Sequence, residues 1–160
     1  MPVAPISAEA VAIAQTKNLI ASCATFIAAT NSVDFTAAKN SVYILETLPA
    51  SGIYKRPFAL ILLPIFIEGV NKPAIPSGDI SVVLEIDAVA GDSSEDAYYR
   101  AANFFGGCKS DATQLGTTIK GVVNDAALRF KQIVQIGNYL RSRDSEDEVG
   151  FWQCRWTIQL

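Results

Sequence analysis

The run PFALILLPIFI, from Pro57 to Ile67, holds eleven residues without a charge between Arg56 and Glu68. A half-exposed strand alternates apolar and polar residues, so this unbroken run predicts a strand covered on both faces. The run is too short to cross a bilayer as a helix. Pro64 has no N–H for a ladder hydrogen bond, and it predicts a bulge or a short edge stretch within the strand. The rest of the chain must therefore supply layers on both sides of this strand.

The composition indicates one domain with more apolar residues than a core requires. The 160 residues are 50% hydrophobic and 18% charged, and we expect them to form a single domain, 1–160. The apolar surplus predicts contacts with other chains, with an unusually apolar monomer as the alternative. A formal net charge of −3 disfavours adhesion to nucleic-acid phosphates. The start MPVAPISAEA does not resemble an export signal.

Helices are expected before and after a group of strands. Ser7 to Thr30 is rich in alanine, with Ser7 as the N-cap, and predicts one long helix. It carries only two charges, so we expect it to be covered on a second side, by the sheet and by another subunit. Leu19 and Phe26, beside its main apolar stripe, are the candidate subunit contacts. Ser94 to Ala127 predicts further helix, which Gly106-Gly107 should end or break.

The strands are expected to form an antiparallel sheet, which makes the fold class α+β with about five strands. The Pro57 run should pair antiparallel with the strand before it, across the turn at Pro49 to Gly52. Gly69 to Asp79 is dense in Gly and Pro and predicts a projecting loop. The predicted strands are Val42 to Leu48, Pro57 to Ile67, Ile80 to Ala88, Phe130 to Arg141 and Phe151 to Leu160.

The sequence contains few residues that could act in catalysis or bind a metal ion. The chain has no His, which removes the commonest general base and metal ligand. Cys23, Cys108 and Cys154 are odd in number and widely spaced, so they predict buried thiols of a reducing compartment rather than disulfides or a metal knuckle. Trp152 and Trp156 share one face of a strand, either as core or as a stacking platform for a ligand. We predict no catalytic residue, no cofactor and no metal site.

In layout, the chain resembles the tail terminator proteins of long-tailed bacteriophages. The resemblance covers nearly the whole chain. It lies in the order of elements and in RPFALILL at Arg56, SVVLEI at Ser81, DSSED at Asp92 and the W-x-x-x-W-x-I pattern from Trp152. The broken helix expected at Gly106-Gly107 departs from that layout, which needs only one helix there. Other neck or connector proteins (head-completion, stopper) and the tail tube protein are the alternatives. A small cytoplasmic carboxylate-dependent enzyme or ligand-binding domain is a further one.

The resemblance implies a structural, non-enzymatic protein of the virion tail or neck, assembled in the host cytoplasm. Such proteins form a homohexameric ring that caps the tail tube, ends its polymerisation and joins it to the head-side connector. DNA only passes through the channel, and no membrane is involved. The loop is then expected to contact a neighbouring subunit through Val70, Asn71, Lys72, Pro73, Ile75 and Pro76.

An acidic turn follows Arg143 and has two interpretations. In a ring it would line the channel and repel phosphate, or it simply points outward into solvent. Arg141 and Arg143 are expected to pair with carboxylates, locally or across a subunit boundary. The candidate channel residues are Asp144, Glu146, Asp147 and Glu148.

Overall fold

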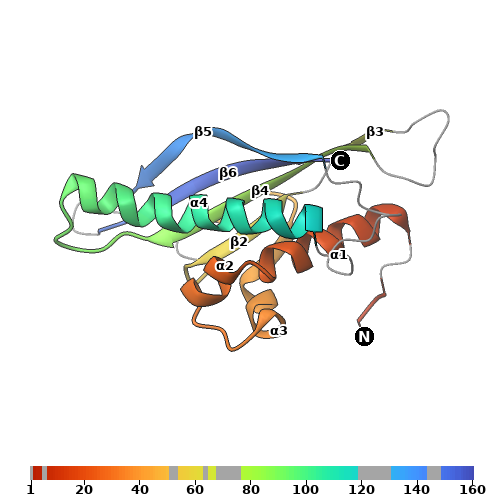
Figure 1. Cartoon of the computed structure of the whole chain (residues 1–160), viewed down its shortest axis with the longest axis horizontal. Helices are drawn as coiled ribbons and strands as arrows, with labels where there is room; N and C mark the ends of the chain where they lie inside the picture. Colours follow the sequence, from red (N-terminus) through yellow and green to blue (C-terminus); the bar gives the residue numbers. More distant parts are fainter. Residues whose placement is uncertain are drawn as a thin grey trace.

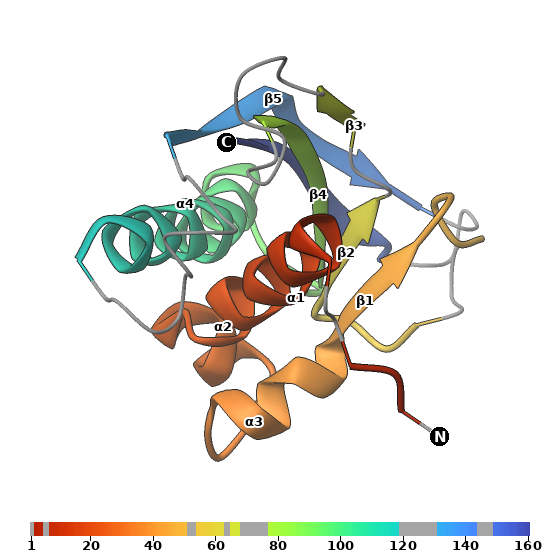
Figure 2. The same ribbon diagram turned by 90° about the vertical axis from the view of Figure 1, so that its right-hand side faces the viewer.

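The computed structural model describes residues 2–4, 7–50, 54–62, 65–67, 77–118, 131–143 and 149–160. Helices and a mixed sheet make up an α+β fold, with the helices gathered on one face of the sheet (Figures 1 and 2). The helices are α1 (Ala8–Ala21), α2 (Ala24–Ala29), α3 (Phe35–Ala38), the 3-10 turn η1 (Lys39–Ser41) and α4 (Ser94–Thr118). The strands are β1 (Val42–Leu45), β2 (Phe58–Leu62), β3 (Ile65–Ile67), β4 (Ser77–Asp87), β5 (Gln132–Ser142) and β6 (Phe151–Gln159).

The sheet has the order β1-β2-β4-β6-β5, with β3 also paired to β4. All its pairs are antiparallel except β1 with β2, which run parallel. The expected antiparallel pairing of these two strands is therefore wrong. A tight turn returns the chain antiparallel, whereas the connection 46–57 is about as long as the crossover that parallel strands require. Strand β1 also ends at Leu45 rather than Leu48.

The predicted central strand is buried on both faces, as expected. Ala59 and Ile61 belong to the main core beneath the helices, and Phe58 and Leu60 pack on the opposite face with Val83. These four of the five β2 side chains are at most 2% exposed. The run divides into β2 and β3, which pair with successive parts of β4, while 63–64 lie outside the described residues.

The N-terminal helical region is two helices rather than the single one predicted. Cys23 has an extended backbone (φ −65°, ψ 123°) between α1 and α2. The break lets α2 turn toward α4, where the rings of Phe26 and Phe104 lie 6.5 Å apart. The backbone N–H of Thr25, near the start of α2, donates to Oδ2 of Asp111 on α4 at 2.9 Å. A partner from another helix thus satisfies a donor that a helix start leaves free.

Helix α4 passes through Gly106-Gly107 without a break, so the predicted interruption is wrong. A Cβ atom at Gly107 would lie 2.8 Å from Oγ1 of Thr25. The missing side chain therefore permits close packing of α2 on α4, which outweighs the low helix propensity of glycine. The helical prediction for 119–127 falls outside the described residues.

Strand β6 has the predicted alternation. Its inward residues belong to the main core or pack against it, and they are Trp152, Cys154, Trp156, Ile158 and the adjoining Leu160. The tryptophan pair is therefore core and not a ligand platform. Among the described helices, none is long and apolar enough to span a membrane.

Candidate functional site

The structure corrects the subunit contacts that were predicted on the first helix. Leu19 and Phe26 are 0% exposed, both within the chain's own core. A side chain without accessible surface cannot touch another subunit, so the expected role is wrong for both. The predicted loop contacts at 70–76 and the predicted channel residues at 144–148 lie outside the described residues.

The face of α1 that does remain accessible borders a groove, which we call the α1 groove. It has a volume of about 750 Å³. Five of its lining residues follow helical spacing along α1, and a strand residue, Ile44 of β1, also lines it. The lining residues are Pro2, Val3, Ala4, Ala10, Ile13, Ala14, Lys17, Asn18, Lys39 and Ile44.

Helix α1 therefore has two apolar faces. Ala12, Leu19 and Ile20 face the core and are 0% exposed, whereas Ala10, Ile13 and Ala14 face the groove. At 100° per residue Ala10 and Ala14 point away from Ala12 and Leu19, whereas Ile13 points within about 20° of Ile20 and lies at the edge between the two sets. The expectation that a second side of the helix is covered by another subunit stays a prediction, and Leu19 and Phe26 do not belong to the side that lines the groove.

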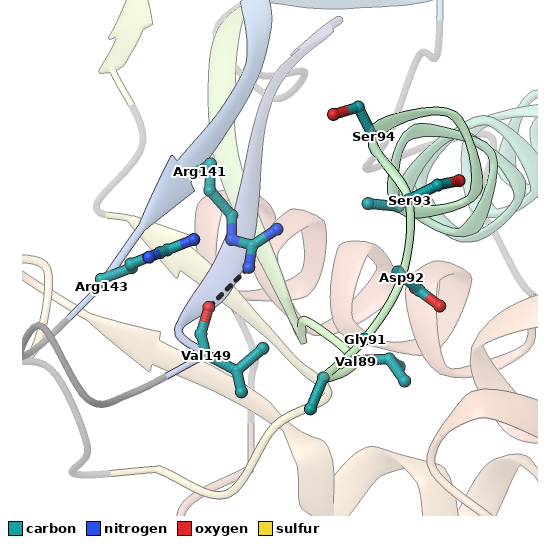
Figure 3. A pocket seen from close by; sticks show the side chains of 10 residues that line it. Val89, Gly91, Asp92, Ser93, Ser94, Arg141, Arg143 and Val149 are labelled. Carbon is teal, nitrogen blue, oxygen red and sulfur yellow. Dashed lines mark hydrogen bonds between the residues drawn. The ribbon is translucent and has the colours of Figure 1, made fainter.

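A second hollow lies at the N-terminal end of α4, and Figure 3 shows it from close by. Its volume is about 400 Å³. Arg141 and Arg143, at the end of β5, stand on one side of it, and Asp92, Ser93 and Ser94 stand on the other (Figure 3). The guanidinium of Arg141 donates to the carbonyl of Val149 at 2.6 Å.

Both positively and negatively charged side chains surround this hollow. Arg100 donates to both oxygens of Asp92, at 2.8 and 3.0 Å, and this hydrogen bonding lowers the pKa of the Asp92 carboxyl, with Arg141 adding a smaller effect. Glu95 and Asp96 occupy the first turn of α4. Within the described part of the chain, Arg141 and Arg143 form no ion pair with a carboxylate, so the local pairing expected for them is not found there. The acidic groups beside the helix start weaken the site for a free anion.

The third feature is a cluster of polar side chains on the face of the sheet away from the helices. Arg56 donates from Nε to Oε1 of Glu85 at 2.9 Å, and Gln153 donates to Oε2 of the same carboxylate at 3.0 Å. The Arg56 guanidinium also stands 3.7 Å over the ring of Phe151. The hollow beside this cluster has a volume of about 180 Å³, below the range typical of small-molecule sites. The cluster joins the segment around Arg56 to β4 and β6.

The three cysteines are free and buried, as predicted. Burial raises the pKa of Cys23 to about 12 and that of Cys154 to about 11, and it raises the pKa of Cys108 further. Thiols held neutral in this way are poor nucleophiles. In the described ranges, no three Cys, Asp or Glu side chains are grouped as metal ligands.

The described residues thus present a groove along α1, a hollow at the start of α4 and a polar cluster on the face of the sheet away from the helices. Sequence reasoning missed the α1 groove because Ile44 and Lys39 come from elements distant from α1 along the chain. It missed the pairing of Asp92 with Arg100 because both belong to a predicted turn and helix start, where charges are commonly solvated. No protein-family model and no curated protein matches the chain.

Proposed function

We propose that the chain is a structural subunit that assembles with copies of itself into a ring, which caps the tail tube of a long-tailed bacteriophage and joins the tail to the head connector. The observation that carries the proposal is the second apolar face of α1. Its first face is already filled by the core, yet Ala10 and Ala14 on the other side, with Ile13 at the edge between the two faces, line an open groove. An apolar surface of this kind marks a contact with another chain.

The order of elements supports the specific role. An N-terminal helical region, a group of strands, one helix and two closing strands follow the layout of tail terminator proteins. The continuity of α4 removes the departure expected at Gly106-Gly107. In this role the protein has no catalytic site and no cofactor, and DNA passes through the ring without being gripped.

Light scattering after size exclusion, followed by negative-stain imaging, tests the proposal. We expect a single closed ring with six-fold symmetry and a central channel. A tail tube protein would instead stack into long tubes as its concentration rises, so discrete rings separate the two roles. A monomer at every concentration, with a melting temperature that rises on adding a small molecule, would contradict the proposal in favour of a ligand-binding domain.

A further inference from the structure

The charged side chains that line the α1 groove are all positive. Lys17 and Lys39 are among its ten lining residues, and none of those residues is acidic. Two copies that met groove to groove would place these lysines against each other, which like charges disfavour. The occupant of the groove should therefore be an apolar surface with carboxylates beside it.

Such a surface exists near the N-terminal end of α4. Tyr98 and Tyr99 are each 53% exposed, and their rings lie 6.4 Å apart. Glu95 and Asp96 precede them by one helical turn or less, and the Tyr99 hydroxyl donates to Glu95 at 2.8 Å. Arg100, the nearby cation on this helix, is already paired with Asp92. We call these four residues, Glu95, Asp96, Tyr98 and Tyr99, the tyrosine knob.

The groove and the knob lie at opposite ends of the molecule. The N-terminal ends of α1 and α4 point to opposite sides of Figure 1, and β1, which borders the groove, is at the opposite sheet edge from β5. Two different, complementary surfaces at opposite ends produce a head-to-tail contact. Repeated contacts of this kind close into a ring when the rotation between copies permits.

We propose that the α1 groove of one copy of this chain receives the tyrosine knob of the next. The aromatic rings cover the apolar floor formed by Ile13 and Ala14. The carboxylates of Glu95 and Asp96 approach Lys17 and Lys39. Among the described strands, β1 pairs only with β2, so its open edge beside the groove is available to the incoming copy. This inference rests on the proposed self-assembly and names the surfaces that carry it.

Charge reversal on each side tests the contact. The groove variant is Lys17→Glu with Lys39→Glu, and the knob variant is Glu95→Lys with Asp96→Lys. Each alone should weaken self-association by about tenfold or more, because like charges then face each other. The measurement is sedimentation velocity over a range of concentrations, with circular dichroism to show that each variant is folded.

Recombining the variants makes the test specific. A chain with all four substitutions should assemble again, since both surfaces have changed sign. A mixture of the groove variant and the knob variant should also assemble, with the two copies alternating. The matched control is Lys55→Glu with Lys131→Glu, which changes the charge equally at two exposed positions outside the groove and should leave assembly unchanged.

The outcomes separate this inference from the proposed function. If the wild type forms rings and the folded groove variant forms them equally well, the surfaces are wrong and the ring proposal stands. Should the wild type associate through these surfaces into open filaments that never close, the contact stands and the ring proposal fails. A wild type that is monomeric at all concentrations overturns both. Failure of the mixture to assemble, when each variant alone is monomeric and folded, overturns the pairing of groove with knob.

Discussion

Arg56 and Glu85 form an ion pair at 2.9 Å in which the side chains are only 11% and 9% exposed. Arg56 precedes β2, and Glu85 lies on β4, the neighbouring strand. Gln153 on β6 binds the other oxygen of the carboxylate. The Glu85 carboxylate therefore connects Arg56, two residues before β2, to β4 and β6, on the face of the sheet away from the helices.

Removing Glu85 should be costly, because the nearly buried Arg56 guanidinium loses the carboxylate that it pairs with at 2.9 Å. We expect Glu85→Ala to lower the free energy of unfolding by about 3 kcal/mol or more, measured by urea denaturation. Asp87→Ala is the control. Asp87 also pairs with Arg56, at 3.4 Å, but it is 64% exposed, so its loss should cost about 1 kcal/mol or less. Equal losses from both substitutions would show that burial does not decide the strength of this cluster.

The adjacent glycines of α4 should respond in opposite directions to alanine. A Cβ at Gly107 would meet Thr25 at 2.8 to 3.4 Å, whereas at Gly106 the nearest atom is the Tyr139 hydroxyl, at 3.9 Å. Gly107→Ala should destabilise the protein by about 1–3 kcal/mol through overpacking. Gly106→Ala should stabilise it by up to about 1 kcal/mol, because alanine favours the helix. Thermal unfolding of the two variants measures both effects, and a stabilising Gly107→Ala would refute the close packing of α2 on α4.

The contact between Asp111 and α2 should act as a helix cap supplied from another helix. Cys23, the N-cap residue of α2, makes no side-chain capping bond, so the Asp111 carboxylate is the acceptor for the Thr25 N–H. Asp111→Ala should reduce the free energy of unfolding by about 0.5–2 kcal/mol. Asp111→Asn, which keeps an acceptor oxygen, should lose less. Hydrogen exchange at the Thr25 amide provides a local measurement, and unchanged protection in Asp111→Ala would exclude the capping role.

The buried thiols predict a loss of stability at alkaline pH. In the unfolded chain a thiol ionises with a pKa of about 8.5, whereas burial raises the pKa of Cys154 to about 11. The folded state thus holds its proton more tightly, and the stability that this provides is complete below pH 8.5 and disappears as pH rises toward 11. Urea denaturation of wild type and Cys154→Ala at pH 7 and pH 10 should show a steeper loss in the wild type. Parallel losses would contradict the raised pKa.

The positions of most strands were predictable because alternation and apolar runs are local properties of the sequence. Strands β4 and β6 and the two-sided burial of β2 follow from such patterns. The direction of β1 was not predictable in this way, because it depends on the path taken by the connection 46–57. Similarly, the packing site that Gly107 provides is filled by Thr25, which lies far away along the chain, and a glycine pair inside a continuous helix is not foreseen from helix propensity alone.

The groove on α1 was only partly predictable. The low charge of the first helix predicted two covered faces; one lies in the core, and the other borders the open α1 groove, where cover by another subunit stays a prediction. Which face is inside depends on how α1 sits over β1 and β2, so Leu19 was assigned outward when it is in the core. Lys39 and Ile44 join the groove through the short helical turn and strand after α2, a juxtaposition without a sequence signature.

The place of β6 has a consequence for synthesis. It lies between β4 and β5, although both neighbours precede it in the chain. While the ribosome has yet to release Phe151–Gln159, β5 lacks its only partner among the described strands, and β4 is open along one side. Folding of the sheet is therefore completed after translation of this segment rather than during it. Until then the edges of β4 and β5 that β6 covers carry unpaired backbone N–H and C=O groups, which can pair with a strand of another chain.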